Sequence, residues 1–126
     1  MRIFVEARSP VQLFALGALI RTRPGWVVVG AATNPAEVMK KAKRAKPDVI
    51  LLDWNGEGQI AEAIISLKAT TRNAVLIVLG TDPVLRQQVL GWGADYFFSK
   101  ANCPEKLMDI LEICDKAQSE RIPGLY

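Results

Sequence analysis

The chain has 126 residues, of which 50% are apolar and 23% are charged, a composition that excludes disorder and suits one globular domain. Its 16 Lys and Arg residues against 13 Asp and Glu residues give a net charge of +3, far from the charge density of a dedicated nucleic-acid binder. The chain has no histidine, which excludes Ser-His-Asp and Cys-His catalysis, zinc ligated by histidine, and phosphotransfer from a histidine of this chain.

The two cysteines and the longest apolar stretch indicate the compartment. Cys103 and Cys114 lie on one predicted helix, about 16 Å apart by helical rise, which is too far for a disulfide. The apolar stretch at 11–20 is too short to span a membrane and lacks a signal-peptide cleavage site. We therefore expect a soluble protein in a reducing, cytoplasmic compartment, with no membrane partner.

Short apolar runs alternate with longer segments of helical period along the chain. The runs predict strands at 3–5, 26–30, 48–53, 74–79 and 96–98. Helices are predicted between them, ending near residues 20, 45, 70, 92 and 118. Four helix starts carry a capping signal: Ser9-Pro10, Asn34-Pro35-Ala36-Glu37, Asp82-Pro83 and Asn102-Cys103-Pro104-Glu105.

Strict alternation of strand and helix predicts an α/β fold: a five-stranded parallel sheet, doubly wound as (βα)5, with helices on both faces. We assign one domain to residues 1–118 and a C-terminal tail or linker stub to residues 119–126. In such sheets the functional crevice lies beyond the carboxyl ends of the strands.

A carboxylate and an ammonium are expected to meet at that edge. Asp53 ends the third strand and Lys100 follows the last one. The pair has two interpretations: a phosphoryl-accepting site, in which the carboxylate attacks and the ammonium stabilises phosphate oxygens, or a structural salt bridge.

Two segments and several shorter ones resemble the receiver domains of response regulators, most closely those that precede a helix-turn-helix DNA-binding domain. These segments are 46–53, 93–100, Ser9-Pro10, Gly30-Ala31-Ala32 and 104–107. The resemblance implies a flavodoxin-like receiver fold and a role in two-component phosphorelay signalling. It is specific for the fold and incomplete for the phosphorylation site.

The resemblance also assigns the positions at the sheet edge. Three positions match: the phosphoacceptor is Asp53, the phosphate-site lysine is Lys100 and the switch aromatic is Phe97. Two positions depart from the family pattern. The acidic pair falls on Ala7 and Arg8, with Glu6 nearby, and the Thr/Ser position falls on Gly80, with Thr81 nearby. Loss of two carboxylates and gain of a guanidinium change the local charge by about three units, each worth a few kcal/mol at short range. We therefore expect no cofactor, negligible Mg²⁺ affinity and poor or absent phosphorylation.

Arg8 leaves two possibilities open. It takes the place of the metal and pairs with Asp53, with Lys100 on the other side, or it points to solvent. An alternative for the whole site is a working phospho-accepting regulator, in which Asp53, Asn55 and Glu6 hold Mg²⁺ and Thr81 supplies the hydroxyl.

The resemblance implies a signalling module that is not an enzyme and that acts through protein partners, either a histidine kinase or a downstream regulator. A homodimer through the fourth helix, last strand and last helix is a further implication. The basic run at 40–46 is a solvated helix face or a footprint for nucleic acid or an acidic partner; direct nucleic-acid binding is not expected. A remote alternative is a flavodoxin-like small-molecule binder, although residues 6–10 lack the required hydroxyl- and Gly-rich loop.

Overall fold

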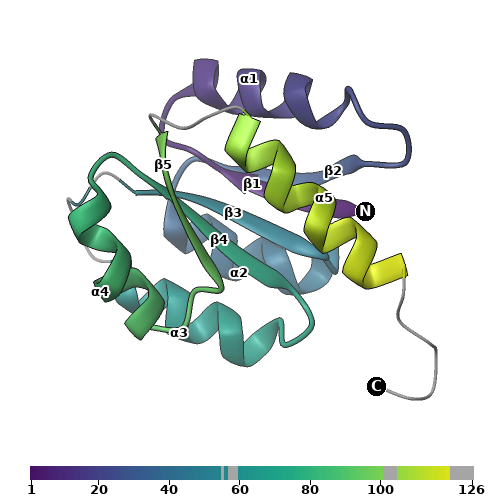
Figure 1. The fold of residues 1–126 in the computed structure, drawn as a ribbon. Coiled ribbons are helices and arrows are strands. Elements are labelled where there is room, and N and C mark those ends of the chain that lie inside the picture. Colours follow the sequence, from purple (N-terminus) through teal and green to yellow (C-terminus); the bar gives the residue numbers. More distant parts are fainter. Residues whose placement is uncertain (55, 57–59, 101–104, 120–126) are drawn as a thin grey trace.

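The computed structural model describes residues 1–54, 56, 60–100 and 105–119. Five parallel strands form one sheet in the order β2-β1-β3-β4-β5 (Figure 1). Their bounds are β1 Arg2–Glu6, β2 Val27–Ala32, β3 Val49–Trp54, β4 Val75–Gly80 and β5 Tyr96–Ser99. The predicted α/β class and the doubly wound parallel sheet are confirmed.

The helices cover both faces of this sheet, as Figure 1 shows. Their bounds are α1 Pro10–Ile20, α2 Pro35–Ala45, α3 Ala61–Thr70, a 3₁₀ turn η1 Pro83–Leu85, α4 Arg86–Gly91 and α5 Glu105–Ser119. Helices α1 and α5 lie on one face, and α2, α3 and α4 lie on the other. None of the helices among the described residues has both the length and the apolar run that a membrane crossing needs.

Alternate residues of each strand supply two separate cores. On β3, Ile50 and Leu52 face the α2–α3–α4 side, whereas Val49 and Leu51 face the α1–α5 side. All four are essentially buried, because a central parallel strand is covered on both faces. This burial fixes the register of β3 and thereby the position of the residues that follow Leu52.

The structure differs from the sequence-based expectation in the fourth helix. This helix was expected to start directly after Asp82-Pro83, but it starts with η1 and only then becomes α-helical. Asp82 still caps it, because its carboxylate accepts from the Val84 amide at 3.0 Å, and the Leu85 amide donates to the Asp82 carbonyl at 3.0 Å. The capping signal is the same for both helix types, and a tight 3₁₀ turn is common at a helix start.

The C-terminal predictions fall partly outside the described residues. Helix α5 continues to Ser119, and the proposed boundary between residues 118 and 119 stays a prediction. Cys114 is a free, buried cysteine of α5, whereas Cys103 and the capping residue Asn102 lie outside the described residues.

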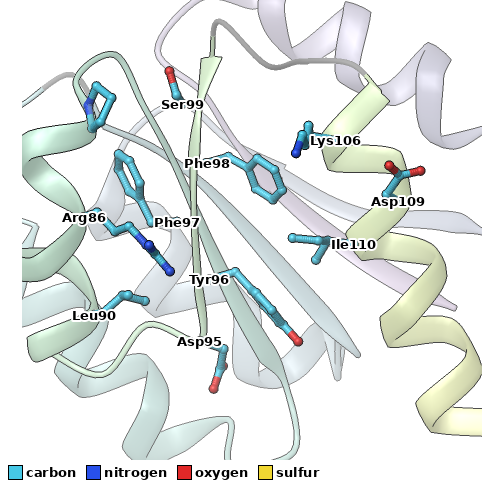
Figure 2. Close-up of a pocket in the computed structure, with 11 residues that line it drawn as sticks. Arg86, Leu90, Asp95, Tyr96, Phe97, Phe98, Ser99, Lys106, Asp109 and Ile110 are labelled. Atoms are coloured by element: carbon cyan, nitrogen blue, oxygen red, sulfur yellow. The ribbon is translucent and has the colours of Figure 1, made fainter.

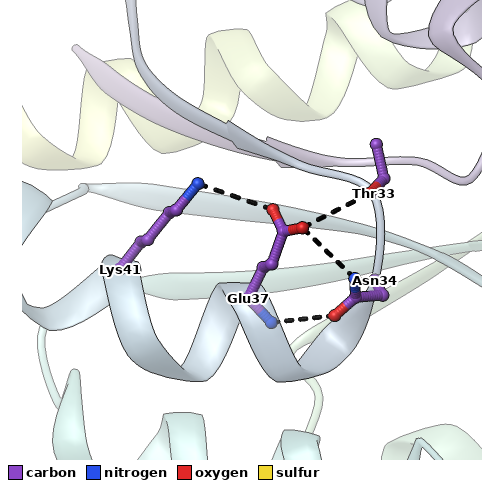
Figure 3. Close-up of polar contacts among 4 residues, drawn as sticks. All are labelled: Thr33, Asn34, Glu37 and Lys41. Atoms are coloured by element: carbon purple, nitrogen blue, oxygen red, sulfur yellow. Dashed lines mark hydrogen bonds and ion pairs between the residues drawn. The ribbon is translucent and has the colours of Figure 1, made fainter.

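The start of α2 shows the predicted capping contacts (Figure 3). The Glu37 amide donates to Asn34 Oδ1 at 2.9 Å, and Glu37 Oε1 accepts in return from the Asn34 side-chain amide at 3.3 Å. Thr33 also donates to Glu37, and Lys41 pairs with it at 3.5 Å. Glu37 is the one acidic residue of α2. Its carboxylate is engaged by the residues at the helix start and by Lys41.

The end of α2 has an unusual backbone. Lys46 adopts the left-handed conformation (φ 50°, ψ 58°), which glycine normally occupies after a helix. It is the only non-glycine residue with a positive φ among the described residues. The Arg2 guanidinium holds this end in place, since Nη2 donates to the Ala45 carbonyl at 2.7 Å and Nε to the Lys46 carbonyl at 3.1 Å.

We expect Lys46→Gly to raise the free energy of unfolding by about 1 kcal/mol, because glycine removes the steric cost of the left-handed conformation. The matched variant is Lys40→Gly in the middle of α2, where the same change should lower the free energy of unfolding by about 0.7–1 kcal/mol. Urea unfolding measures both. Destabilisation by Lys46→Gly would contradict the strain assigned here.

Candidate functional site

The carboxyl ends of the strands bring Asp53 and Lys100 together. Asp53 is the next-to-last residue of β3, and Lys100 directly follows β5. Lys100 Nζ forms an ion pair with Asp53 Oδ1, while the Asp53 side chain is only 8% exposed and that of Lys100 is 29% exposed. A carboxylate that is nearly buried requires such a partner, because desolvation of an isolated charge is very costly.

Glu6 is a second acidic group at this edge, and it is the one buried charged residue among those described. It ends β1 in register with Leu52, and its Oε2 accepts a hydrogen bond from the Asp53 amide at 2.9 Å. Burial raises the pKa of Glu6 from 4.5 to about 7. The Asp53 amide lowers this pKa, the Asp53 charge raises it, and the charges of Arg8 and Lys100 lower it.

The two positions assigned to the acidic pair carry no carboxylate. Ala7 is fully buried, and its amide donates to the Ala32 carbonyl at 3.1 Å. Arg8 is exposed, and its charge acts on the Glu6 carboxyl. A direct pair between Arg8 and Asp53 stays a prediction.

Gly80 and Phe97 occupy adjacent strands and pack on each other. Gly80 ends β4, where a Cβ atom would lie 2.5 Å from Cε2 and 2.6 Å from Cζ of the Phe97 ring. The missing side chain at position 80 is therefore what allows the ring to lie where it does. Phe97 is half-buried against the α2–α3–α4 core, whereas Thr81 is exposed.

Trp54, which follows Asp53, packs against the end of α4. It is 7% exposed, and its ring centroid lies 5.6 Å from that of Trp92 at an interplanar angle of 58°. This contact joins β3 to the helix on its flank.

The donor atoms at this edge do not fit a hydrated Mg²⁺ ion, the metal that receiver domains in general bind at their phosphorylation site. Asp53 Oδ1 faces an ammonium, and Glu6 is a buried carboxyl whose raised pKa favours the neutral form. No group of three acidic, Cys or His side chains that could hold a metal occurs within the described part of the chain. Asn55, the remaining candidate ligand, lies outside it.

The sequence did not predict two features of the site. The bond between Glu6 and the Asp53 amide joins residues 47 positions apart, and only the strand register aligns them. The Gly80–Phe97 contact depends on the pairing of β4 with β5. The sequence carried one usable signal: a glutamate at the end of the apolar run 3–5, where a carboxylate would have to be buried.

Comparison with known proteins identifies the class. No family model matches the chain. It is 31% identical over 102 residues to the "Probable transcriptional regulatory protein NarL" of Mycobacterium tuberculosis, covering 78% of this chain and 47% of that protein. It is 28% identical over 102 residues to the chemotaxis protein CheY of Thermotoga maritima, covering 77% and 83%. The response regulator domain of Thermotoga maritima CheB superposes with a TM-score of 0.77 at 22% identity, covering 97% and 98%.

The sheet order, the Asp53–Lys100 edge and these relatives define a receiver fold of the CheY type. The chain has the fold of the receiver domains of two-component response regulators, and its sequence is similar to those of NarL and CheY. It spans about half the length of the NarL relative that it matches.

We expect the contribution of Glu6 to the free energy of unfolding to fall as the pH rises from about 4.5 to 7 and to level off above pH 7. The folded state holds a proton on Glu6 that the unfolded chain releases near pH 4.5, so deprotonation favours unfolding. Glu6→Gln should remove this slope, so that the variant gains up to about 3 kcal/mol relative to wild type between pH 4.5 and 8. Urea unfolding across this range measures the difference.

The matched control is Glu62→Gln, an exposed glutamate of α3, which should leave the slope unchanged. Parallel pH profiles for wild type and Glu6→Gln would contradict the buried, neutral carboxyl.

We expect Gly80→Ala to destabilise the fold by about 1–3 kcal/mol, because the new methyl group overlaps the Phe97 ring. In a Phe97→Ala background the same change should cost less than about 0.5 kcal/mol, since the overlapping atoms are gone. A double-mutant cycle of urea unfolding measures this coupling. Equal costs in the two backgrounds would show that the ring is not what Gly80 accommodates.

Proposed function

We propose that this chain is an atypical receiver domain that is poorly or not phosphorylated and that signals through protein–protein contacts. The observation that carries the proposal is the ion pair between Asp53 and Lys100 at an edge where Ala7 and Arg8 replace the acidic pair. The proposal includes no catalytic activity, no bound cofactor, a cytoplasmic location and no direct nucleic-acid contact.

Electrostatics supports the loss of phosphorylation. A dianionic phosphoryl group on Asp53 needs a divalent cation to offset its charge, and two carboxylates are the usual means of holding that cation. Here Arg8 contributes a positive charge near the carboxyl edge instead. A unit charge a few Å from a divalent ion costs a few kcal/mol even at an effective dielectric constant near 20, so Mg²⁺ binding is strongly weakened.

The Gly80–Phe97 contact supports a switch that does not respond to phosphate. Glycine provides no hydroxyl to bind a phosphoryl oxygen, and Phe97 provides none to move with it. The ring also occupies the space that a side chain at position 80 would need. The two hydroxyl groups that would form hydrogen bonds in a phosphate-driven movement, at positions 80 and 97, are therefore missing.

The surface formed by α4, β5 and α5 supports a protein partner. It contains a cavity of about 500 Å³ whose walls come from these elements, with Arg86, Tyr96 and Ile110 among the lining residues (Figure 2). Val84 is 80% exposed beside it, and Ile113 on α5 is 57% exposed. The cavity together with these exposed apolar side chains supports an interaction surface, which we assign to a homodimer or to a kinase or downstream regulator.

One observation favours a second candidate, a working phosphoacceptor. Glu6 lies at the same edge as Asp53 and could provide one metal ligand when ionised. Thr81 would then have to supply the hydroxyl from an exposed position one residue beyond Gly80.

We expect no stoichiometric modification of Asp53 by acetyl phosphate, and no beryllofluoride adduct, at millimolar Mg²⁺. Intact-mass spectrometry detects the phosphoryl group, and Asp53→Asn provides the blank. Arg8→Asp restores one carboxylate at an exposed position and should raise the modified fraction. Stoichiometric modification of the wild-type protein would refute the atypical receiver and establish the working one.

A further inference from the structure

We propose that α2 and the α3–β4 turn form a docking surface for an acidic segment of a partner protein. This inference goes beyond the proposed function, because it concerns the edge of the sheet opposite Asp53. The surface consists of five cations, here called the basic surface: Lys40, Lys43, Arg44, Lys46 and Arg72. None of the five has a carboxylate within salt-bridge distance among the residues that the structure describes, whereas their neighbour Lys41 pairs with Glu37.

A recess on the α3 side of α2 gathers three of these cations. It has a volume of about 340 Å³, and Lys43, Lys46 and Arg72 line it together with Asn73. Asp48 is its one acidic lining residue, and Asp48 Oδ2 already accepts a hydrogen bond from the Arg2 amide at 2.7 Å. The lining therefore keeps a net positive charge that suits a carboxylate.

A second recess lies on the β2 side of α2, with a volume of about 400 Å³. Lys40, Lys41 and Arg44 line it, and its remaining lining residues, Phe4, Val29, Gly30 and Ala45, are apolar. Gly30 leaves room for the Phe4 ring, because a Cβ atom there would lie 2.5 Å from the ring. An apolar floor below a cationic rim suits an apolar side chain whose neighbours in sequence are acidic.

The backbone at Lys46 is an independent sign that this side chain has a role. Lysine is held in a left-handed conformation directly before Pro47, where glycine would fit without strain. Favourable interaction with the helix dipole accounts for cations in the last turn, such as Lys43 and Arg44. Lys46 and Arg72 lie just beyond the ends of α2 and α3, where the effect of the helix dipole falls off.

An acidic peptide fits this surface better than nucleic acid does. The phosphate backbone makes no use of an apolar recess, and Phe4, the aromatic residue that lines the second recess, is fully buried and offers a base no stacking platform. An extended segment advances about 3.3 Å per residue, so about four residues cross the roughly 10 Å width of α2 and reach both recesses. The occupant is therefore a short acidic segment with an apolar residue.

The test uses the full 126-residue chain and a fluorescein-labelled peptide of repeated Glu-Glu-Leu units, followed by anisotropy. We expect saturable binding that weakens from about 50 mM to about 200 mM salt. The triple variant Lys43→Gln/Lys46→Gln/Arg72→Gln should lose about tenfold in affinity, as expected for a few exposed charge pairs. The matched control, Arg21→Gln/Arg23→Gln/Lys116→Gln, removes the same charge from the segment after α1 and from α5, and should change affinity by less than about twofold.

Three results would overturn the proposal: no saturable binding, equal losses in the two triple variants, or tighter binding of a short duplex DNA than of the peptide. The last would assign the surface to nucleic acid. Modification of Asp53 by beryllofluoride is measured at the opposite edge in the same variants, so failure here is distinguishable from failure of the atypical-receiver proposal.

Discussion

The burial of Asp53 is the constraint on which the rest of this carboxyl edge depends. Its strand is covered on both faces, so the carboxylate emerges into a space with little water, and only a cation or a proton makes that position tolerable. Lys100 provides the cation from the end of β5, the strand on the far side of β4. The pairing of β3 with β4 and of β4 with β5 therefore brings the Lys100 ammonium to the Asp53 carboxylate.

The neighbouring substitutions are consistent with an edge that balances its own charges. Burial raises the pKa of Glu6 to about 7, so this carboxyl carries less negative charge beside Asp53 near neutral pH than an exposed glutamate would. The absence of a side chain at Gly80 is matched by the Phe97 ring that fills its place. The departure from the receiver pattern at Gly80 thus has a structural counterpart in Phe97.

The sequence was sufficient for the parts of the fold that depend on local signals. Proline and capping residues mark the starts of α1 and α2, and the buried run of β3 is apolar throughout. The sequence places the start of the second strand at Trp26, one residue before the observed start at Val27. The Trp26 indole donates a hydrogen bond to Asp115 at 2.8 Å. The two residues are 89 positions apart, so no local sequence pattern contains this contact. The convergence of Asp53 and Lys100 followed from topology alone. The partners of Glu6 and Gly80 did not, because they depend on strand register and on ring orientation.

The contact between Trp54 and Trp92 gives the molecule a built-in optical reporter. Two indoles at a centroid separation of 5.6 Å and a tilt of 58° have excited states that couple, and the coupling changes steeply with separation and angle. One ring is fixed to the strand of Asp53 and the other to the end of α4. Circular dichroism of the unlabelled protein therefore follows the distance between β3 and α4, whatever ligand causes it to change.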